Sequence, residues 1–302
     1  MTKLIRLARP HFLLAGISLF LIGAFWAVLN GAPLSLLRLI LGYLIIFLGH
    51  LSISFSNDYF DMAVDSLGSP TLFSGGSGVL VKYPHLRQPA RRIAIILILC
   101  SLVLAIFYAF EFAMPVWFLG YVLTGNLLGW FYTAPPIRLS YRKLGEAANV
   151  FASGLLIPGL GYLVMRGVID ANGLIFSIPL MLYGLAFIIS VEIPDLEMDR
   201  QGHKSTLVTR CGRGFGFRMV GLSLILASAF FFCMAWWLAN NYPLEFRFLA
   251  LASLLPTAAG IIGAIKQPLE RQPATHMVNA TIISLAAFLI LTDSYLIVLA
   301  TH

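Results

Sequence analysis

The chain has 302 residues, of which 59% are hydrophobic and only 11% are charged. Soluble globular chains carry about 25% charged residues, so a fold surrounded by water could not hide this much apolar surface, whereas a bilayer solvates it. The net charge of +7 does not indicate nucleic acid, because basic residues of membrane proteins gather at the cytoplasmic surface. The three cysteines lack the spacing of a metal or redox motif. We therefore predict an integral membrane protein with no nucleic-acid partner.

Apolar runs separated by charged or Pro/Gly-rich breaks predict an all-α fold with a single domain, residues 1–302. Runs of about 20 residues are long enough to cross a hydrocarbon core of about 30 Å. The first run is interpreted as a retained helix, because no small-residue cleavage site and soluble domain follow it. The nine predicted spans are 12–31, 34–56, 92–112, 114–133, 144–167, 172–194, 215–240, 246–266 and 275–300.

The basic residues predict how these spans cross the membrane. With the N-terminus in the cytoplasm, all of the 20 Lys and Arg fall on the cytoplasmic side except Arg38, Arg166 and Arg247. A missed span would reverse the later loops and spoil this separation. The positive-inside rule therefore favours nine spans with a cytoplasmic N-terminus.

Acidic residues gather in two short windows, one after the second span and one at the end of the sixth. These windows contain Asp58, Asp61 and Asp65, and then Glu192, Asp195, Glu197 and Asp199. Together they hold more than half of the 13 acidic residues of the chain. In each window three carboxylates follow an i, i+3, i+7 spacing, which places them on one helical face. Both windows face the cytoplasm in the predicted topology.

A row of carboxylates at the end of a helix needs a cationic partner. Like charges on one helical face repel each other, and the C-terminal end of a helix is already partially negative. Mg²⁺ fits such a row, because it takes one or two carboxylates, keeps some waters and shares its other positions with phosphate. The alternative is two solvated acidic patches at the membrane surface, which does not account for the matching spacing on the same side.

Basic residues near these windows are candidates for holding a diphosphate, whose charge requires cationic donors as well as metal. They are Lys82, Arg87, Arg91, Arg92, Arg138, Arg142, Lys143, Arg200 and Lys204. Most are interpreted as ordinary positive-inside residues. For a phosphate role we select Arg138, Lys143 and Lys204.

The two windows resemble the motifs of the UbiA superfamily of intramembrane prenyltransferases. Residues 57–65, NDYFDMAVD, have the Asn-Asp-x-x-Asp-x-x-x-Asp form of the first motif, and residues 195–206, DLEMDRQGHKST, are similar to the second. Arg9-Pro10 and the YTAPP-R-L loop at 132–139 also resemble the family, so the likeness covers essentially the whole chain. The sequence departs from the family where Glu192 replaces Asn or Asp.

The resemblance implies a helical bundle around a central cavity, with a cap of cytoplasmic loops and an opening to lipid. It implies a Mg²⁺-dependent enzyme that binds two ions and takes a polyprenyl diphosphate and an aromatic or lipid acceptor. The implied metal ligands are Asn57, Asp58, Asp61 and Asp65 for one ion, and Asp195 and Asp199 for the other. The implied catalytic residues are Asp61, Asp65, Asp195, Asp199, Arg138 and Lys143, and the implied substrate-binding residues are Asn57, Lys82, Tyr132, Tyr141, Lys204 and His50.

Three further features have more than one interpretation. His50 is either a pocket residue or a partner in a helix–helix hydrogen bond. Glu146 is either a helix-start acid or a pocket residue. The glycine-rich segment 74–78, SGGSG, lacks a Walker lysine and is interpreted as a flexible lid over the pocket.

Other functional classes fit the sequence less well. A transporter would place ionisable groups near the middle of the bilayer, and a di-iron enzyme would carry Glu-x-x-His motifs that this chain lacks. A non-catalytic scaffold remains a third alternative. Within the prenyltransferases the loop at 132–146 looks closest to the branch that prenylates dihydroxynaphthoate for menaquinone. Hydroxybenzoate, haem, chlorin and ether-lipid acceptors remain open.

Overall fold

A computed structural model describes residues 2–237, 242 and 244–301. Three short 3-10 turns lie at Pro84–Leu86, Leu139–Tyr141 and Asn172–Leu174, and a π-helical turn lies at Ala152–Leu156. The helices are α1 Thr2–Ala8, α2 Pro10–Leu29, α3 Leu36–Asp65, α4 Val79–Lys82, α5 Arg87–Glu111, α6 Trp117–Phe131, α7 Gly145–Phe151, α8 Ile157–Arg166, α9 Ser177–Gln201, α10 Leu207–Cys211, α11 Arg213–Trp237, α12 Phe246–Lys266 and α13 Arg271–Thr301.

Eight helical segments of the described chain are long and apolar enough to cross a membrane. They correspond to eight of the nine predicted spans, and the all-α membrane fold is confirmed. The predicted span 114–133 is the exception, because it contains α6, a helix of 15 residues. At 1.5 Å per residue α6 extends about 22 Å, less than the hydrocarbon thickness. The count of nine therefore stays a prediction.

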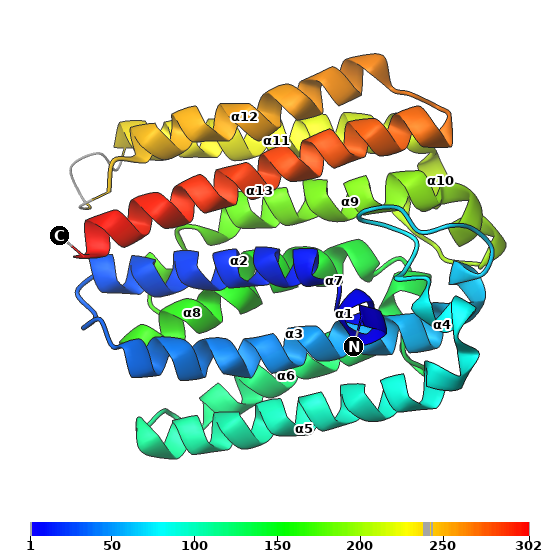
Figure 1. The fold of residues 1–302 in the computed structure, drawn as a ribbon. Coiled ribbons are helices and arrows are strands. Elements are labelled where there is room, and N and C mark those ends of the chain that lie inside the picture. The colour runs from blue at the N-terminus through cyan, green and yellow to red at the C-terminus, as the bar shows by residue number, and fades with distance from the viewer. Residues whose placement is uncertain (1, 238–241, 243, 302) are drawn as a thin grey trace.

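The long helices stack as neighbouring layers. Figure 1 shows α11 and α12 at one edge of the bundle and α5 at the other, with α13 and α9, then α2 and α8, then α3 and α6 between them. The main hydrophobic core runs through α2, α8, α9, α11 and α13. A smaller core joins α1, α4 and the start of α5 to the end of α3. This second core holds α1 and α4 against the end of α3.

Small residues allow α2 and α8 to approach closely. A Cβ on Gly23 would lie 1.8 Å from the carbonyl oxygen of Pro158, and one on Gly161 would lie 2.0 Å from that of Phe20. Such contacts between backbones are the usual way in which membrane helices pack, because lipid tails compete for apolar contacts between larger side chains. The α2–α8 pair is thus fixed in the middle of the bundle.

One irregular stretch interrupts the span Gly145–Arg166. Residues Ala152–Leu156 form a π-helical turn between α7 and α8. Such turns frequently occur at functional sites, and Ala152, Ser153 and Leu156 line the central cavity. The irregular turn therefore shapes one wall of that cavity.

Candidate active site at the ends of α3 and α9

A central cavity of about 640 Å³ opens where α3 and α9 end. Its mouth is polar and is formed by the ends of α3 and α9 together with the loops that follow them. Deeper in the bundle the walls are largely apolar, with Ile45, Leu156, Leu160, Phe187 and Leu285 among the lining residues. The cavity thus offers charged groups at one end and a hydrocarbon-like interior at the other.

The first acidic row does not act as one unit. Asp61 and Asp65 line the cavity. Asp58 is buried and absent from the described cavity lining, because its carboxylate forms an ion pair with Arg9 and accepts hydrogen bonds from Ser77. In the structure Asp58 thus holds the N-terminal segment and the loop at residue 77, whereas the role predicted for it was that of a Mg²⁺ ligand.

The second acidic row, unlike the first, faces the cavity with all three of its carboxylates. Glu192, Asp195 and Asp199 line the cavity, whereas Glu197 points elsewhere and binds the guanidinium of Arg213 at 2.5–2.7 Å. Oδ1 of Asp195 and Oε2 of Glu192 are buried and have no hydrogen-bond partner among the described residues. Oxygen atoms that remain free at the mouth of a cavity are available to a ligand.

Lys204 lies between the two rows. Its Nζ is 2.8 Å from Oδ2 of Asp61 on α3 and 3.6 Å from Oδ1 of Asp199 on α9. Burial alone would lower the pKa of Lys204, but the carboxylates of Asp61 and Asp199 outweigh it and raise the pKa well above its usual value. The ammonium group is therefore charged, and the two rows share one site.

The glycine-rich loop predicted as a lid covers this site. The backbone N–H of Gly75 donates to Oδ2 of Asp195 at 2.8 Å. Gly76 has a φ of +69°, and a Cβ there would lie 2.1 Å from Oδ2 of Asp65, so only glycine fits. At the base of the loop, Arg271 donates to the backbone oxygen of Ser69 at 2.7 Å. The loop is thus attached to both acidic rows.

Four of the predicted substrate-binding residues line the cavity, namely His50, Asn57, Tyr132 and Lys204. The amide oxygen of Asn57 accepts a hydrogen bond from Thr133 at 2.9 Å. Tyr141 does not line the cavity, but its hydroxyl donates to Oδ1 of Asp61 at 2.7 Å. Burial, followed by the nearby Asp61 carboxylate, raises the pKa of Tyr141. Tyr141 therefore remains a neutral hydrogen-bond donor.

The predicted basic residues are not all at the site. Lys82 and Lys143 are exposed, and the described cavity lining includes neither of them. The guanidinium of Arg138 lies 3.7 Å from the centre of the Tyr141 ring. Tyr141 therefore lies between Arg138 and Asp61. Of the three preferred candidates only Lys204 lines the cavity. In the sequence, an exposed basic residue on the cytoplasmic side looks the same as a basic residue of the pocket. The pattern of Lys and Arg alone therefore does not distinguish the two roles.

Sequence reasoning gave no site role to Arg9, which lines the cavity. Its Nε is buried without a hydrogen-bond partner in the described chain. The signal in the sequence that could have indicated Arg9 is the Arg9-Pro10 pair just before the first span. Glu146 is buried and accepts a hydrogen bond from the backbone N–H of Leu207, so it anchors the loop that carries Lys204.

The donor set fits a magnesium ion that is shared with a phosphate ligand. Within the described residues, no three His, Cys, Asp or Glu side chains form a complete metal cage. Mg²⁺ does not require one, because it is usually held by one or two carboxylates plus waters and substrate phosphates. The free Oδ1 of Asp195 and the carboxylates of Asp61, Asp65 and Asp199 at the cavity mouth supply oxygen ligands of this type.

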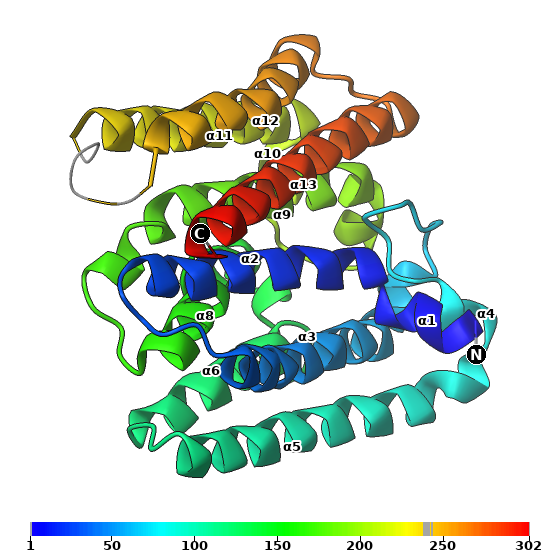
Figure 2. The same cartoon turned by 60° about the vertical axis from the view of Figure 1, so that its left-hand side comes forward.

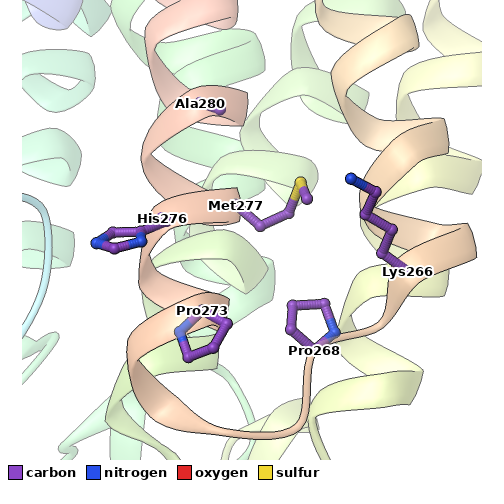
Figure 3. Close-up of a pocket in the computed structure, with 6 residues that line it drawn as sticks. All are labelled: Lys266, Pro268, Pro273, His276, Met277 and Ala280. Atoms are coloured by element: carbon purple, nitrogen blue, oxygen red, sulfur yellow. The ribbon is translucent and has the colours of Figure 1, made fainter.

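A second pocket of about 360 Å³ lies between the end of α12 and the start of α13. Figure 3 shows Met277 and Lys266 on one side of the α13 start and His276 pointing away from them. Its other lining residues are Pro268, Pro273 and Ala280. Because its lining contains no carboxylate, it does not compete with the central cavity as a site for phosphate chemistry that depends on metal.

Relatives of this chain share both its sequence pattern and its fold. It is 24% identical over 224 residues, 74% of this chain and 70% of the relative, to the 1,4-dihydroxy-2-naphthoate octaprenyltransferase of Bacillus subtilis (strain 168). A UbiA homolog from Archaeoglobus fulgidus, solved bound to GPP and Mg²⁺, has a TM-score of 0.71 at 18% identity, with 99% of this chain and 100% of that chain covered.

The apo structure of a UbiA homolog from Aeropyrum pernix K1 is also similar, with a TM-score of 0.67 at 16% identity over 95% of this chain and 98% of that one. At such identities the solved structures show a common fold. The sequence matches the UbiA prenyltransferase family over residues 16–291. The chain therefore belongs to the UbiA prenyltransferase family.

Proposed function

We propose that this prenyltransferase moves a polyprenyl group from a polyprenyl diphosphate to an aromatic quinone precursor, and that the reaction requires Mg²⁺. The observation that carries the proposal is the meeting of Asp61 and Asp199, from separate helices, around Lys204 at the mouth of an apolar cavity. Charged groups suit a diphosphate, and the apolar interior suits its hydrocarbon tail. The two ends of the donor therefore match the two ends of the cavity.

The metal ligands in this proposal are Asn57, Asp61 and Asp65 on α3, and Asp195 and Asp199 on α9. Two ions are proposed because the ligands come from two helices. Bound Mg²⁺ would neutralise the diphosphate and stabilise the charge that develops as it leaves. Asp58 is not included, because Arg9 and Ser77 occupy its carboxylate.

The side chains of the chain itself position the donor and protect the reaction. Lys204 is held as a cation between the acidic rows and can donate to a phosphate oxygen. The loop around Gly75 covers the site and limits the entry of water, which would otherwise capture the reacting carbon. Tyr132 lines the cavity, and its ring is a candidate for stabilising positive charge.

The reaction breaks the allylic C–O bond, and its electron pair leaves with the diphosphate. The allylic carbocation that remains is captured by an electron-rich carbon of the acceptor. The new C–C bond forms while the acceptor loses either a proton or a carboxyl group from the ring carbon, which restores aromaticity. Diphosphate and the prenylated acceptor are products in both cases, and loss of the carboxyl group also releases CO₂.

The acceptor is proposed to be of the dihydroxynaphthoate type. The support is the Bacillus subtilis relative, whose name gives 1,4-dihydroxy-2-naphthoate as its acceptor, together with the likeness of the loop at 132–146. A lipid, haem or chlorin acceptor would use the same donor chemistry. A digeranylgeranylglyceryl phosphate synthase has the same fold at 16% identity and a TM-score of 0.65, and it keeps the lipid alternative open.

Purified protein in lipid nanodiscs, supplied with Mg²⁺ and labelled polyprenyl diphosphate, tests the proposal against a panel of acceptors. We expect labelled product with dihydroxynaphthoate and release of one diphosphate for each product. Product with another acceptor alone would correct the acceptor class. Absence of diphosphate release with every acceptor would refute the donor assignment.

A further inference from the structure

A buried carboxyl group lies on α13 beyond the residues of that helix that line the cavity, far along the chain from both acidic rows. Asp293 on α13 is only 7% exposed, and its Oδ1 has no hydrogen-bond partner in the part of the chain that the structure describes. It belongs to a helix that is apolar enough to cross the membrane. Acidic residues in such helices are costly and usually functional, and the proposed transfer chemistry does not use this one.

The position of Asp293 continues one wall of the cavity. Ile282, Leu285, Ala286 and Leu289 of α13 line the cavity, and Asp293 follows Leu289 by one helical turn on the same face. Ser18 of α2, a side chain close to Asp293, also lines the cavity. The acid therefore lies directly beyond the last cavity-lining turn of α13.

The two helices meet at this depth. In Figures 1 and 2, α2 and α13 lie apart near the cavity mouth and converge toward the opposite end of the bundle. Around Ser18, the lining residues of α2 are the apolar Leu14, Ala15, Ile17 and Leu19. The hydroxyl of Ser18 and the carboxyl of Asp293 are thus polar groups on an otherwise apolar side of the cavity, whose other walls also carry His50, Ser101 and Asn126.

We propose that Ser18 and Asp293 form a polar floor that sets the longest prenyl tail the cavity accepts. This inference rests on the proposed function, because it concerns the tail of the same donor. The apolar end of a long prenyl tail would keep hydrogen-bond donors away from the unpaired Oδ1 of Asp293. Leaving a buried polar group without a hydrogen bond costs free energy. Tails that end before the floor avoid this cost, and tails that reach it do not.

A second route for the tail exists on the side of the bundle. Leu14, Ile283 and Ile290 line the cavity but are 68%, 56% and 59% exposed, so the cavity also borders lipid between α2 and α13. A long tail that left by this route would never reach Asp293. The two routes therefore predict different effects of changing the floor.

The test measures binding of non-reacting prenyl thiodiphosphates of increasing length to the full chain in nanodiscs with Mg²⁺. The variants are Asp293→Leu, which removes the carboxyl group, and Asp293→Asn, which keeps a polar group of similar size. We expect Asp293→Leu to shift the ratio of long-tail to short-tail affinity by about tenfold toward the long tail, the size of a penalty for burying an unpaired polar group. Asp293→Asn should keep the wild-type ratio.

Ser18→Val tests the same floor from α2 if Asp293→Leu does not fold, and it should shift the ratio in the same direction. An unchanged ratio in the folded variants would overturn the polar floor and favour the lateral route, while the proposed function would stand. Failure of the wild-type protein to bind any prenyl thiodiphosphate would overturn the proposed function and this inference with it.

Discussion

Lys204 stabilises the site by balancing carboxylates that belong to different helices. Asp61 and Asp199 both lie within 4 Å of its ammonium group. Removing one partner of a buried ionic cluster leaves the other charges uncompensated and costs about 3 kcal/mol or more. The side chain is therefore expected to matter for stability as well as for binding the donor.

We expect Lys204→Met to lower the melting temperature of the protein in detergent with EDTA, and Mg²⁺ to restore much of the loss by replacing the missing positive charge. Because the pKa of Lys204 is raised in the folded state, its contribution is complete below the pKa of the unfolded chain and is lost only at higher pH. The difference between variant and wild type should thus stay constant from about pH 8 to pH 9.5. A difference that shrinks within this range would contradict a charged Lys204.

Replacing Asp61 or Asp199 by Ala should reduce prenyl transfer by at least about 100-fold, because loss of a metal ligand costs more than loss of the groups that orient it. Initial rates with saturating donor provide the measurement, and size-exclusion profiles show whether each variant folds. Glu197→Ala is the matched control on α9, because Glu197 pairs with Arg213 and lies away from the cavity. Near-normal turnover of either Asp variant would remove that residue from the metal site.

Tyr141 and Arg138 should act on the site through Asp61. Tyr141→Phe removes only the hydroxyl that donates to Asp61, and we expect about a tenfold loss of activity with a higher Mg²⁺ requirement. Arg138→Ala should have a smaller effect in the same direction, because Arg138 contacts the Tyr141 ring. Additive effects in the double variant would show that Arg138 acts independently of Tyr141.

At the scale of the elements, the loop over the site depends on a glycine. Gly76→Ala would place a Cβ against the Asp65 carboxylate at a positive φ, so we expect at least about a tenfold loss of activity at nearly unchanged melting temperature. Gly212→Ala is the control, because Gly212 also has a positive φ, +83°, but open space around it. Equal losses in both variants would mean that backbone strain alone, and not the contact with Asp65, is responsible.

The sequence predicted the elements well where the physical signal was long and repeated. Eight apolar runs matched helices that can span a membrane, because each run reflects many residues. The 15-residue α6 was overestimated, since apolar residues of the adjoining turns extended the run. The i, i+3, i+7 spacing set Glu197 apart from the second carboxylate row, but it could not distinguish Asp58 from Asp61 and Asp65. The partners of Asp58, which are Arg9 and Ser77, come from distant segments that helical spacing does not reveal.

At the scale of the whole molecule, both acidic rows lie at the end of the bundle that holds α1, α4 and α10 (Figure 1). The distribution of Lys and Arg predicts that this end faces the cytoplasm. Single-cysteine variants at the exposed Lys143, in a background without Cys100, Cys211 and Cys233, should react with a membrane-impermeant maleimide only in inside-out vesicles. Reaction in right-side-out vesicles alone would reverse the orientation.

The Lys204 bridge has a consequence for the affinity of the site. A cation that is covalently part of the chain lies between the acidic rows and offsets part of their negative charge. A donor that brought its own metal ions would compete with this internal counter-ion for the same carboxylates. Its affinity would then reflect the difference between two sets of ionic contacts, and not their sum.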